Sequence, residues 1–212
     1  MEQFDVEGQS CLFTVGHSNH PLEVFLELLK RHEIQVLVDT RSYPYSRHVL
    51  HFNKEELHRA LKRVGIKYLY MGNELGGRPD EEKFYDTEGH VLYYRLAESS
   101  TFLEGIKRLE RGIRRFRVAI MCSEENPSIC HRHLLVGRVI AGHGVKIQHI
   151  RGDGTIQSDT ELPVTDGGQQ LLFNLYEENT WKSLQSVSRR KQQKSSSISS
   201  DATESNDWST SG

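Results

Sequence analysis

Residues 118–132 read VAIMCSEENPSICHR, and this order predicts a strand, a loop and the start of a helix. A short apolar run ends at Cys122, and two glutamates follow it. The Asn126-Pro127 pair is a typical helix start, because asparagine caps free N–H groups and proline has no N–H to leave unpaired. Residues just past the carboxyl end of a strand line the ligand crevice of an α/β protein. We therefore expect 122–124 and 130–132 to share one pocket edge.

The same alternation of apolar runs and amphipathic segments continues on both sides of this stretch. Apolar runs at 11–15, 36–38, 67–71 and 145–150 predict four further strands, and apolar residues at helical spacing between them predict helices. Alternating strands and helices imply parallel strands with right-handed crossovers. The predicted fold is a single three-layer α/β domain, with a mostly parallel sheet of about five strands flanked by helices.

Three local features carry more detailed expectations. Asn53 and Glu56 predict a capping box at the start of a helix that Gly65 ends. The glycine-rich stretch 72–79 lacks the spacing of a phosphate loop or a dinucleotide fingerprint, so we interpret it as a structural loop. Apolar residues between 171 and 176 suggest one last short helix.

Composition divides the chain into three parts. Residues 1–10 predict a short N-terminal arm, and 11–182 predict the α/β domain, which is long enough to bury a sizeable core. Residues 183–212 are rich in serine and cannot bury enough apolar surface to fold, which predicts a disordered tail.

Charge and cysteine content bear on partners and compartment. The net charge is −2, so nothing global indicates nucleic acid or a membrane, although a basic helix face between 107 and 115 is compatible with nucleic acid. No run approaches the roughly 20 apolar residues of a membrane span. Three cysteines form an odd set that suits a reducing compartment. We expect a cytoplasmic protein without membrane association, and the sequence leaves its oligomeric state open.

Six motifs occur together in one order: GHS at 16–18, DTRSYPYSR at 39–47, ELGG at 74–77, CSE at 122–124, CHR at 130–132 and HI at 149–150. This set resembles the family catalogued as domain of unknown function 488, over residues 12–150. The resemblance implies a site built from these polar motifs, and it implies no particular reaction. The chain departs from the family at Ser123, where members usually carry alanine, and in a shorter region at 80–97. These two departures bear on substrate specificity.

On a parallel sheet, the motifs at 16–18, 39–41 and 122–124 fall at the carboxyl ends of three strands. Titratable groups of unlike chemistry gathered at one rim indicate a functional site. The candidate catalytic residues are Asp39, Glu124, Cys122 and His131, and the candidate substrate-binding residues are His17, Ser18, Arg41 and Arg132.

Two enzymatic interpretations remain open. In the favoured one, Asp39 and Glu124 act as general acid and base, while Arg41 and Arg132 hold a phosphate and histidines move a proton near neutral pH. In the other, a cysteine thiolate is the nucleophile, activated by a helix N-terminus and by His131 or Arg132. The spacing of Cys122 and Arg132 does not match the cysteine-phosphatase signature.

Simpler interpretations stand beside these. Asp39 can pair with Arg41 or Arg132 as a structural ion pair, and the cysteines can be small buried residues. A metal held by Cys122, Cys130 and His131 is disfavoured, since adjacent cysteine and histidine are awkward ligands for one ion. We expect no metal and no cofactor.

The sequence thus predicts a hydrolase or lyase that acts on a phosphate-bearing substrate, either a small molecule such as a nucleotide or a nucleic acid. The alternative is a non-catalytic module that binds an anion or a nucleotide. A redox switch built on Cys122 and Cys130 is a third hypothesis.

Overall fold

The computed structural model describes residues 10–162, 181–187 and 208. Within them, six strands form one sheet in the order β3-β2-β4-β1-β5-β6. The first five pair in parallel, and β6 is antiparallel to β5. The strands are β1 (Cys11–Gly16), β2 (Val36–Asp39), β3 (Lys67–Tyr70), β4 (Val118–Cys122), β5 (Lys146–Ile150) and β6 (Ile156–Ser158). The predicted α/β fold with a mostly parallel sheet is confirmed, and β6 is an edge strand that the sequence analysis did not predict.

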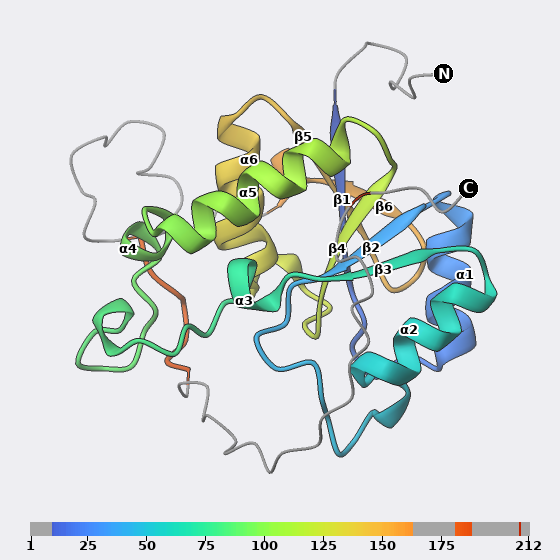
Figure 1. Cartoon of the computed structure of the whole chain (residues 1–212), viewed down its shortest axis with the longest axis horizontal. Helices are drawn as coiled ribbons and strands as arrows, with labels where there is room; N and C mark the ends of the chain where they lie inside the picture. Colours follow the sequence, from blue (N-terminus) through green and yellow to red (C-terminus); the bar gives the residue numbers. More distant parts are fainter. Residues whose placement is uncertain (1–9, 163–180, 188–207, 209–212) are drawn as a thin grey trace.

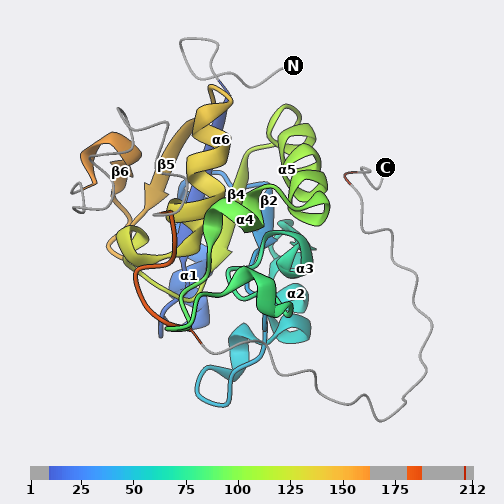
Figure 2. The same ribbon diagram turned by 90° about the vertical axis from the view of Figure 1, so that its left-hand side faces the viewer.

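Helices cover both faces of the sheet (Figure 1). On one face lie α1 (Leu22–Arg31) and α2 (Lys54–Arg63), and on the other lie α5 (Ser100–Ile113) and α6 (Arg138–Gly142). All five residues of β4 are buried, as expected of a strand covered on both sides. Figure 2 shows the same arrangement from the side. None of the helices in the described ranges is long and apolar enough to cross a membrane.

Short elements connect these layers. They are η1 (Leu50–Phe52), α3 (Gly72–Leu75), η2 (Glu82–Phe84), α4 (Tyr93–Ala97), η3 (Pro127–Ile129), the π-helix η4 (Arg132–Gly137) and η5 (Asp159–Glu161). The glycine-rich stretch is therefore partly helical, because its first residues form α3. A Cβ at Gly72 would lie 2.0 Å from the Arg41 carbonyl oxygen, so only glycine lets α3 pack this closely on the loop after β2.

Two local expectations need correction. Asn53 precedes α2, but its side chain does not cap the helix, because Asn53 Oδ1 accepts from the Ser46 amide at 2.7 Å instead. The predicted Asn126-Pro127 helix start does form, and Asn126 Oδ1 accepts from the Ser128 amide at 3.0 Å. That helix lasts for a single turn, however, because Cys130 is extended and the chain restarts as η4.

The topology creates a crevice at the carboxyl end of β4. This strand lies between β1 and β2, whose following connections run to the α1 and α2 face. The connection that follows β4 runs to the opposite face through η4 and α6. Ligands of open α/β sheets bind where neighbouring connections part in this way.

Residues 181–187 pack against the region between η2 and α4. The Ser183 amide donates to the Val91 carbonyl at 2.8 Å, and the Val91 amide donates to Ser183 Oγ at 2.9 Å. Trp181 Nε1 donates to the Leu134 carbonyl at 2.8 Å. The predicted boundary between domain and tail, after residue 182, falls inside this packed segment. Residues 1–9, the predicted helix at 171–176 and most of the predicted tail lie outside the described residues.

Candidate active site

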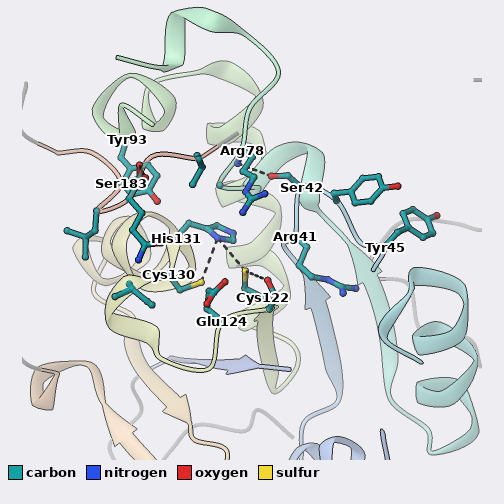
Figure 3. A pocket seen from close by; sticks show the side chains of 17 residues that line it. Arg41, Ser42, Tyr45, Arg78, Tyr93, Cys122, Glu124, Cys130, His131 and Ser183 are labelled. Atoms are coloured by element: carbon teal, nitrogen blue, oxygen red, sulfur yellow. Dashed lines mark hydrogen bonds between the residues drawn. The ribbon is translucent and has the colours of Figure 1, made fainter. Parts of the chain in front are cut away.

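A cavity of about 270 Å³ opens at the carboxyl end of β4 (Figure 3). Its wall comes from the loops that follow β2, α3 and β4, from η3 and from the segment 181–187. Side chains of interest in this wall are Arg41, Ser42, Arg78, Cys122, Glu124, Cys130 and His131. Residues 122–124 and 130–131 therefore do meet at one cavity, on either side of the Asn126-Pro127 turn, but Arg132 does not line it.

A pair of thiols and an imidazole form the floor of this cavity. His131 Nδ1 lies 3.6 Å from Cys122 Sγ and 3.8 Å from Cys130 Sγ. A hydrogen bond from Cys130, together with the charges of His131 and Arg132, holds the pKa of the Cys122 thiol well below its usual value despite its burial. Burial and the neighbouring Cys122 raise the pKa of Cys130. The two cysteines are thus unlike: Cys122 favours the thiolate and Cys130 keeps its proton.

The His131 ring is held in one orientation. Its Nε2 lies 3.1 Å from the Thr40 carbonyl oxygen, to which it must donate. In a neutral ring, Nδ1 is then the acceptor that faces both sulfurs. Gly77 packs against the other side, where an added Cβ would lie 2.6 Å from His131 Cγ. The last glycine of the ELGG motif is therefore required for close packing on this imidazole.

Asp39 and Arg41 form a buried ion pair. Arg41 donates from Nε to Asp39 Oδ1 at 2.9 Å and from Nη2 to Asp39 Oδ2 at 2.6 Å. Tyr68 also donates to this carboxylate, at 2.7 Å. Asp39 is fully buried and does not line the cavity. This geometry is the structural ion pair that the sequence left open, and the carboxylate has no access to a substrate in the cavity.

His17 and Ser18 lie beside the cavity, outside its wall. His17 Nδ1 donates to the Ser18 carbonyl at 2.8 Å, and its Nε2 accepts from Arg41 Nη1 at 3.1 Å. Burial, and next the charge of Arg41, lower the pKa of His17 to about 4. The expectation that His17 moves a proton near neutral pH is therefore wrong, because the ring is neutral there and both nitrogens are engaged. Ser18 anchors the turn, since its amide donates to the Ser123 carbonyl at 2.9 Å.

Arg132 is fully buried, and its guanidinium contacts other groups of the protein and does not line the cavity. Its Nε donates to Thr14 Oγ1 at 3.1 Å, its Nη2 donates to the Glu125 carbonyl at 2.6 Å, and its Nη1 donates to the Glu124 carbonyl. A guanidinium placed this way shapes the loop after β4. The expected role of Arg132 in gripping a phosphate does not fit this placement, because its donors are aimed at backbone and at Thr14.

Arg78 is the cationic side chain that the sequence analysis missed. It is exposed, lines the cavity and points into it (Figure 3). Its guanidinium makes no hydrogen bond or ion pair with the residues that the structure describes. The sequence feature that could have identified Arg78 is its position directly after the ELGG motif. Glu124 also lines the cavity with an exposed side chain, and its carboxylate likewise has no partner among the described residues.

Three groups in the described part of the chain contain residues of metal-binding type, with ligand atoms within 4.8 Å of one another. They are Cys122, Cys130 and His131; His133, His149 and Asp159; and Asp86, Glu88 and His90. Adjacent Cys130 and His131 do direct their side chains to one place, so the sequence argument against a shared ion there does not hold geometrically.

Fold and site together define an α/β protein with a cysteine-containing cavity at a topological switch point. Residues 21–139 match the family model described as Domain of unknown function DUF488. Because the match covers more than half of the 212 residues, the chain belongs to this family. The match includes the motifs at 39–47, 74–77, 122–124 and 130–132. Neither a search of curated proteins nor a search of solved structures found a match to the chain.

Proposed function

We propose that this protein is a cysteine-dependent hydrolase of a phosphate-bearing substrate, such as a nucleotide or a nucleic acid, with Cys122 as its nucleophile. One observation carries the proposal. A thiol whose neighbours favour the thiolate stands in the wall of a cavity into which the Arg78 guanidinium points, and this guanidinium has no partner among the described residues. Catalytic cysteines occupy electropositive surroundings within reach of a ligand, whereas structural cysteines do not need them. Cys122 is only 7% exposed, but it lines the cavity.

The proposed chemistry uses five side chains. His131 Nδ1 accepts the proton of Cys122, and the Cys130 thiol donates a hydrogen bond to the resulting thiolate. The thiolate attacks the electrophilic centre of the substrate and expels the leaving group, which takes the proton from His131 Nδ1, and a covalent intermediate on Cys122 Sγ remains. Glu124 activates the water that hydrolyses this intermediate and restores the thiolate. Arg78 neutralises the anionic group throughout.

This scheme changes the residues favoured from the sequence and keeps the substrate class. Asp39 loses its proposed role as acid or base, because its carboxylate is enclosed by Arg41 and Tyr68. Glu124 keeps a role, since its side chain is exposed at the cavity. Arg78 replaces Arg132 as the anion-binding residue. Sequence spacing did not predict this, because Arg78 comes from a different loop.

A non-catalytic nucleotide-binding module is the second candidate. Tyr43 and Tyr45 line the cavity and are 48% and 39% exposed. Their rings pack edge to face with centroids 5.4 Å apart. Exposed aromatic rings beside a cationic groove are typical stacking surfaces for bases. Such a module needs Arg78 and the tyrosines, and it has no need of an activated thiol.

One set of variants separates the two functions. Wild type and variants are assayed for binding and turnover with phosphate esters, nucleotides and short oligonucleotides. We expect Cys122→Ala to lower kcat/KM by about 1,000-fold or more while binding persists, and Arg78→Gln to weaken binding. Cys11→Ser and Arg47→Gln are matched controls, since neither residue lines the cavity.

Full turnover in Cys122→Ala would overturn the role of the thiol. Binding that needs Arg78, without turnover of any substrate by the wild type, would support the binding module instead.

A further inference from the structure

A second cluster of titratable side chains lies outside the cavity wall, beside the buried Arg132. His149 lies on β5, Asp159 begins η5, and His133 lies on η4. His133 Nδ1 is 2.7 Å from Asp159 Oδ1, and His149 Nε2 is 3.0 Å from the same oxygen. The proposed chemistry of the cavity uses none of the three residues.

The geometry is that of ligands around a shared centre. Two imidazoles from different elements direct one nitrogen each at a single carboxylate oxygen, and all three ligand atoms lie within 4.8 Å of one another. Two histidines and one carboxylate are a recurrent ligand set for zinc and related divalent ions, and catalytic zinc sites with three protein ligands leave a fourth position to water. Here His149 is fully buried, while the side chains of His133 and Asp159 are 23% and 27% exposed, so one side of the cluster is open to solvent.

The surroundings of His149 fit a ligand as well. Its Nδ1 lies 2.8 Å from Thr14 Oγ1, which also accepts from Arg132 Nε at 3.1 Å. Without metal, the Thr14 hydroxyl donates to Nδ1 and Nε2–H donates to Asp159. With an ion on Nε2, the ring proton moves to Nδ1 and donates to Thr14 Oγ1. Metal-binding histidines typically donate their other N–H to a fixed acceptor in this way.

The backbone at His133 also departs from an ordinary helix. Residues 132–137 form a π-helix, which is a rare conformation that often occurs at functional sites. It places Arg132 toward Thr14 and His133 toward Asp159, on adjacent positions of the chain. An ion at His133 would therefore connect η4 with β5 and η5. The preceding residue along the chain, Arg132, donates to the carbonyls of the loop after β4.

We propose that His133, His149 and Asp159 bind one divalent metal ion, with Zn²⁺ the best fit to this set of ligands. The ion joins three elements that are far apart in the sequence, and a water completes its coordination. The site does not depend on the chemistry of the cavity, so it stands or falls independently of the proposed hydrolase function.

The test uses the full chain, stripped of metal with a chelator and then dialysed. Zn²⁺ binding is measured by calorimetry and thermal shift, and Co²⁺ is added as a spectroscopic probe of the ligands. We expect one ion per chain at this site and a higher Tm, by mass action. Asp159→Asn and His133→Gln are each expected to weaken binding by about 100-fold or more, and Thr14→Val by about 10-fold, as for other outer partners of metal ligands.

Two controls address the other clusters. The double variant Cys122→Ser/Cys130→Ser removes the thiol ligands, and His90→Gln removes a ligand of the third group. Both are expected to retain the site, and the Co²⁺ spectrum is expected to lack thiolate charge-transfer bands once the cysteines are replaced. Absence of binding in wild type overturns the proposal. So does binding that survives in both Asp159→Asn and His133→Gln, provided that circular dichroism shows both variants to be folded.

Discussion

Arg41 grips Asp39 with two parallel hydrogen bonds, from Nε at 2.9 Å and from Nη2 at 2.6 Å. The same guanidinium donates to the Phe52 carbonyl at 2.8 Å and to His17 Nε2 at 3.1 Å. Burial opposes its charge, but the hydrogen bond and charge of Asp39 raise the pKa of Arg41. The DTR motif thus connects β2 with η1 and the turn after β1, and it fixes Arg41 in the cavity wall.

Asp39→Asn is predicted to destabilise the fold. The substitution leaves Arg41 buried without its counter-charge, which typically costs about 3–5 kcal/mol. Urea denaturation at pH 7 measures this change in the free energy of unfolding. Glu124→Gln is the control, because its side chain is exposed and a change within about 0.5 kcal/mol is expected. Equal stability of the two variants would contradict the structural role of Asp39.

Stability is predicted to depend on pH through His17. The pKa of its ring is about 4 in the folded chain, against 6.5 for an ordinary histidine. Between these values the unfolded chain binds more protons, so the free energy of unfolding falls as the pH drops from 6.5 toward 4, by up to about 1.4 kcal/mol per unit. The stabilisation that the neutral His17 ring provides is fully present above pH 6.5.

His17→Gln keeps a donor and an acceptor but does not titrate. Urea denaturation of both proteins at pH 5 and pH 7 is expected to show a smaller loss on acidification in the variant. An identical loss would assign the pH dependence to other groups.

The rate of Cys122 alkylation is predicted to reach its plateau at a lower pH than an ordinary thiol does. The hydrogen bond from Cys130 and the charges of His131 and Arg132 favour the thiolate. Cys130→Ala removes that donor and is expected to shift the profile to higher pH, whereas Cys130→Ser retains a donor and shifts it less. Peptide mass spectrometry after iodoacetamide treatment resolves each cysteine. A profile unchanged by Cys130→Ala would show that Cys130 does not activate Cys122.

Gly77→Ala is predicted to slow this alkylation. The added methyl would lie 2.6 Å from His131 Cγ, so the imidazole must move away from its place beside the two sulfurs. The expected readout is a slower reaction of Cys122 at pH 7 with the protein still folded. Gly142→Ala is a matched control, because nothing lies within 4 Å of a Cβ at that position. Equal rates in both variants would separate Gly77 from the thiol chemistry.

Arg132→Lys is predicted to reduce stability although the charge is kept. One ammonium cannot reproduce the planar set of donors that reaches Thr14 and the carbonyls of Glu124 and Glu125. We expect a loss of about 3 kcal/mol in urea denaturation, the lower end for a broken buried charge site. Arg78→Lys, at an exposed position, is expected to change stability by less than about 0.5 kcal/mol. A neutral effect of Arg132→Lys would contradict this role.

The sequence by itself determined the layered architecture, because hydrophobic periodicity is a local property of the chain. The five parallel strands, the helix start at Asn126-Pro127 and the turn at Gly65, with φ of 76°, all follow from short-range rules. Family membership was equally readable, from motifs kept in order. The meeting of residues 122–124 with Cys130 and His131 at one cavity followed from the rule for carboxyl ends of parallel strands, whereas Arg132, expected at the same edge, lies outside the cavity wall.

Only the tertiary structure decided which charged group faces which partner. Arg132 and Thr14 are 118 residues apart, and Thr14 and His149 are 135 apart, so no local pattern assigns these contacts. Two arginines of equal charge therefore lie in different environments. Arg132 is buried and donates to backbone carbonyls, while Arg78 points into the cavity. Asn53 likewise does not cap α2, because its side-chain oxygen accepts from the Ser46 amide. The physical reason is that a polar side chain takes the partner that packing brings to it, and packing is set by the whole chain.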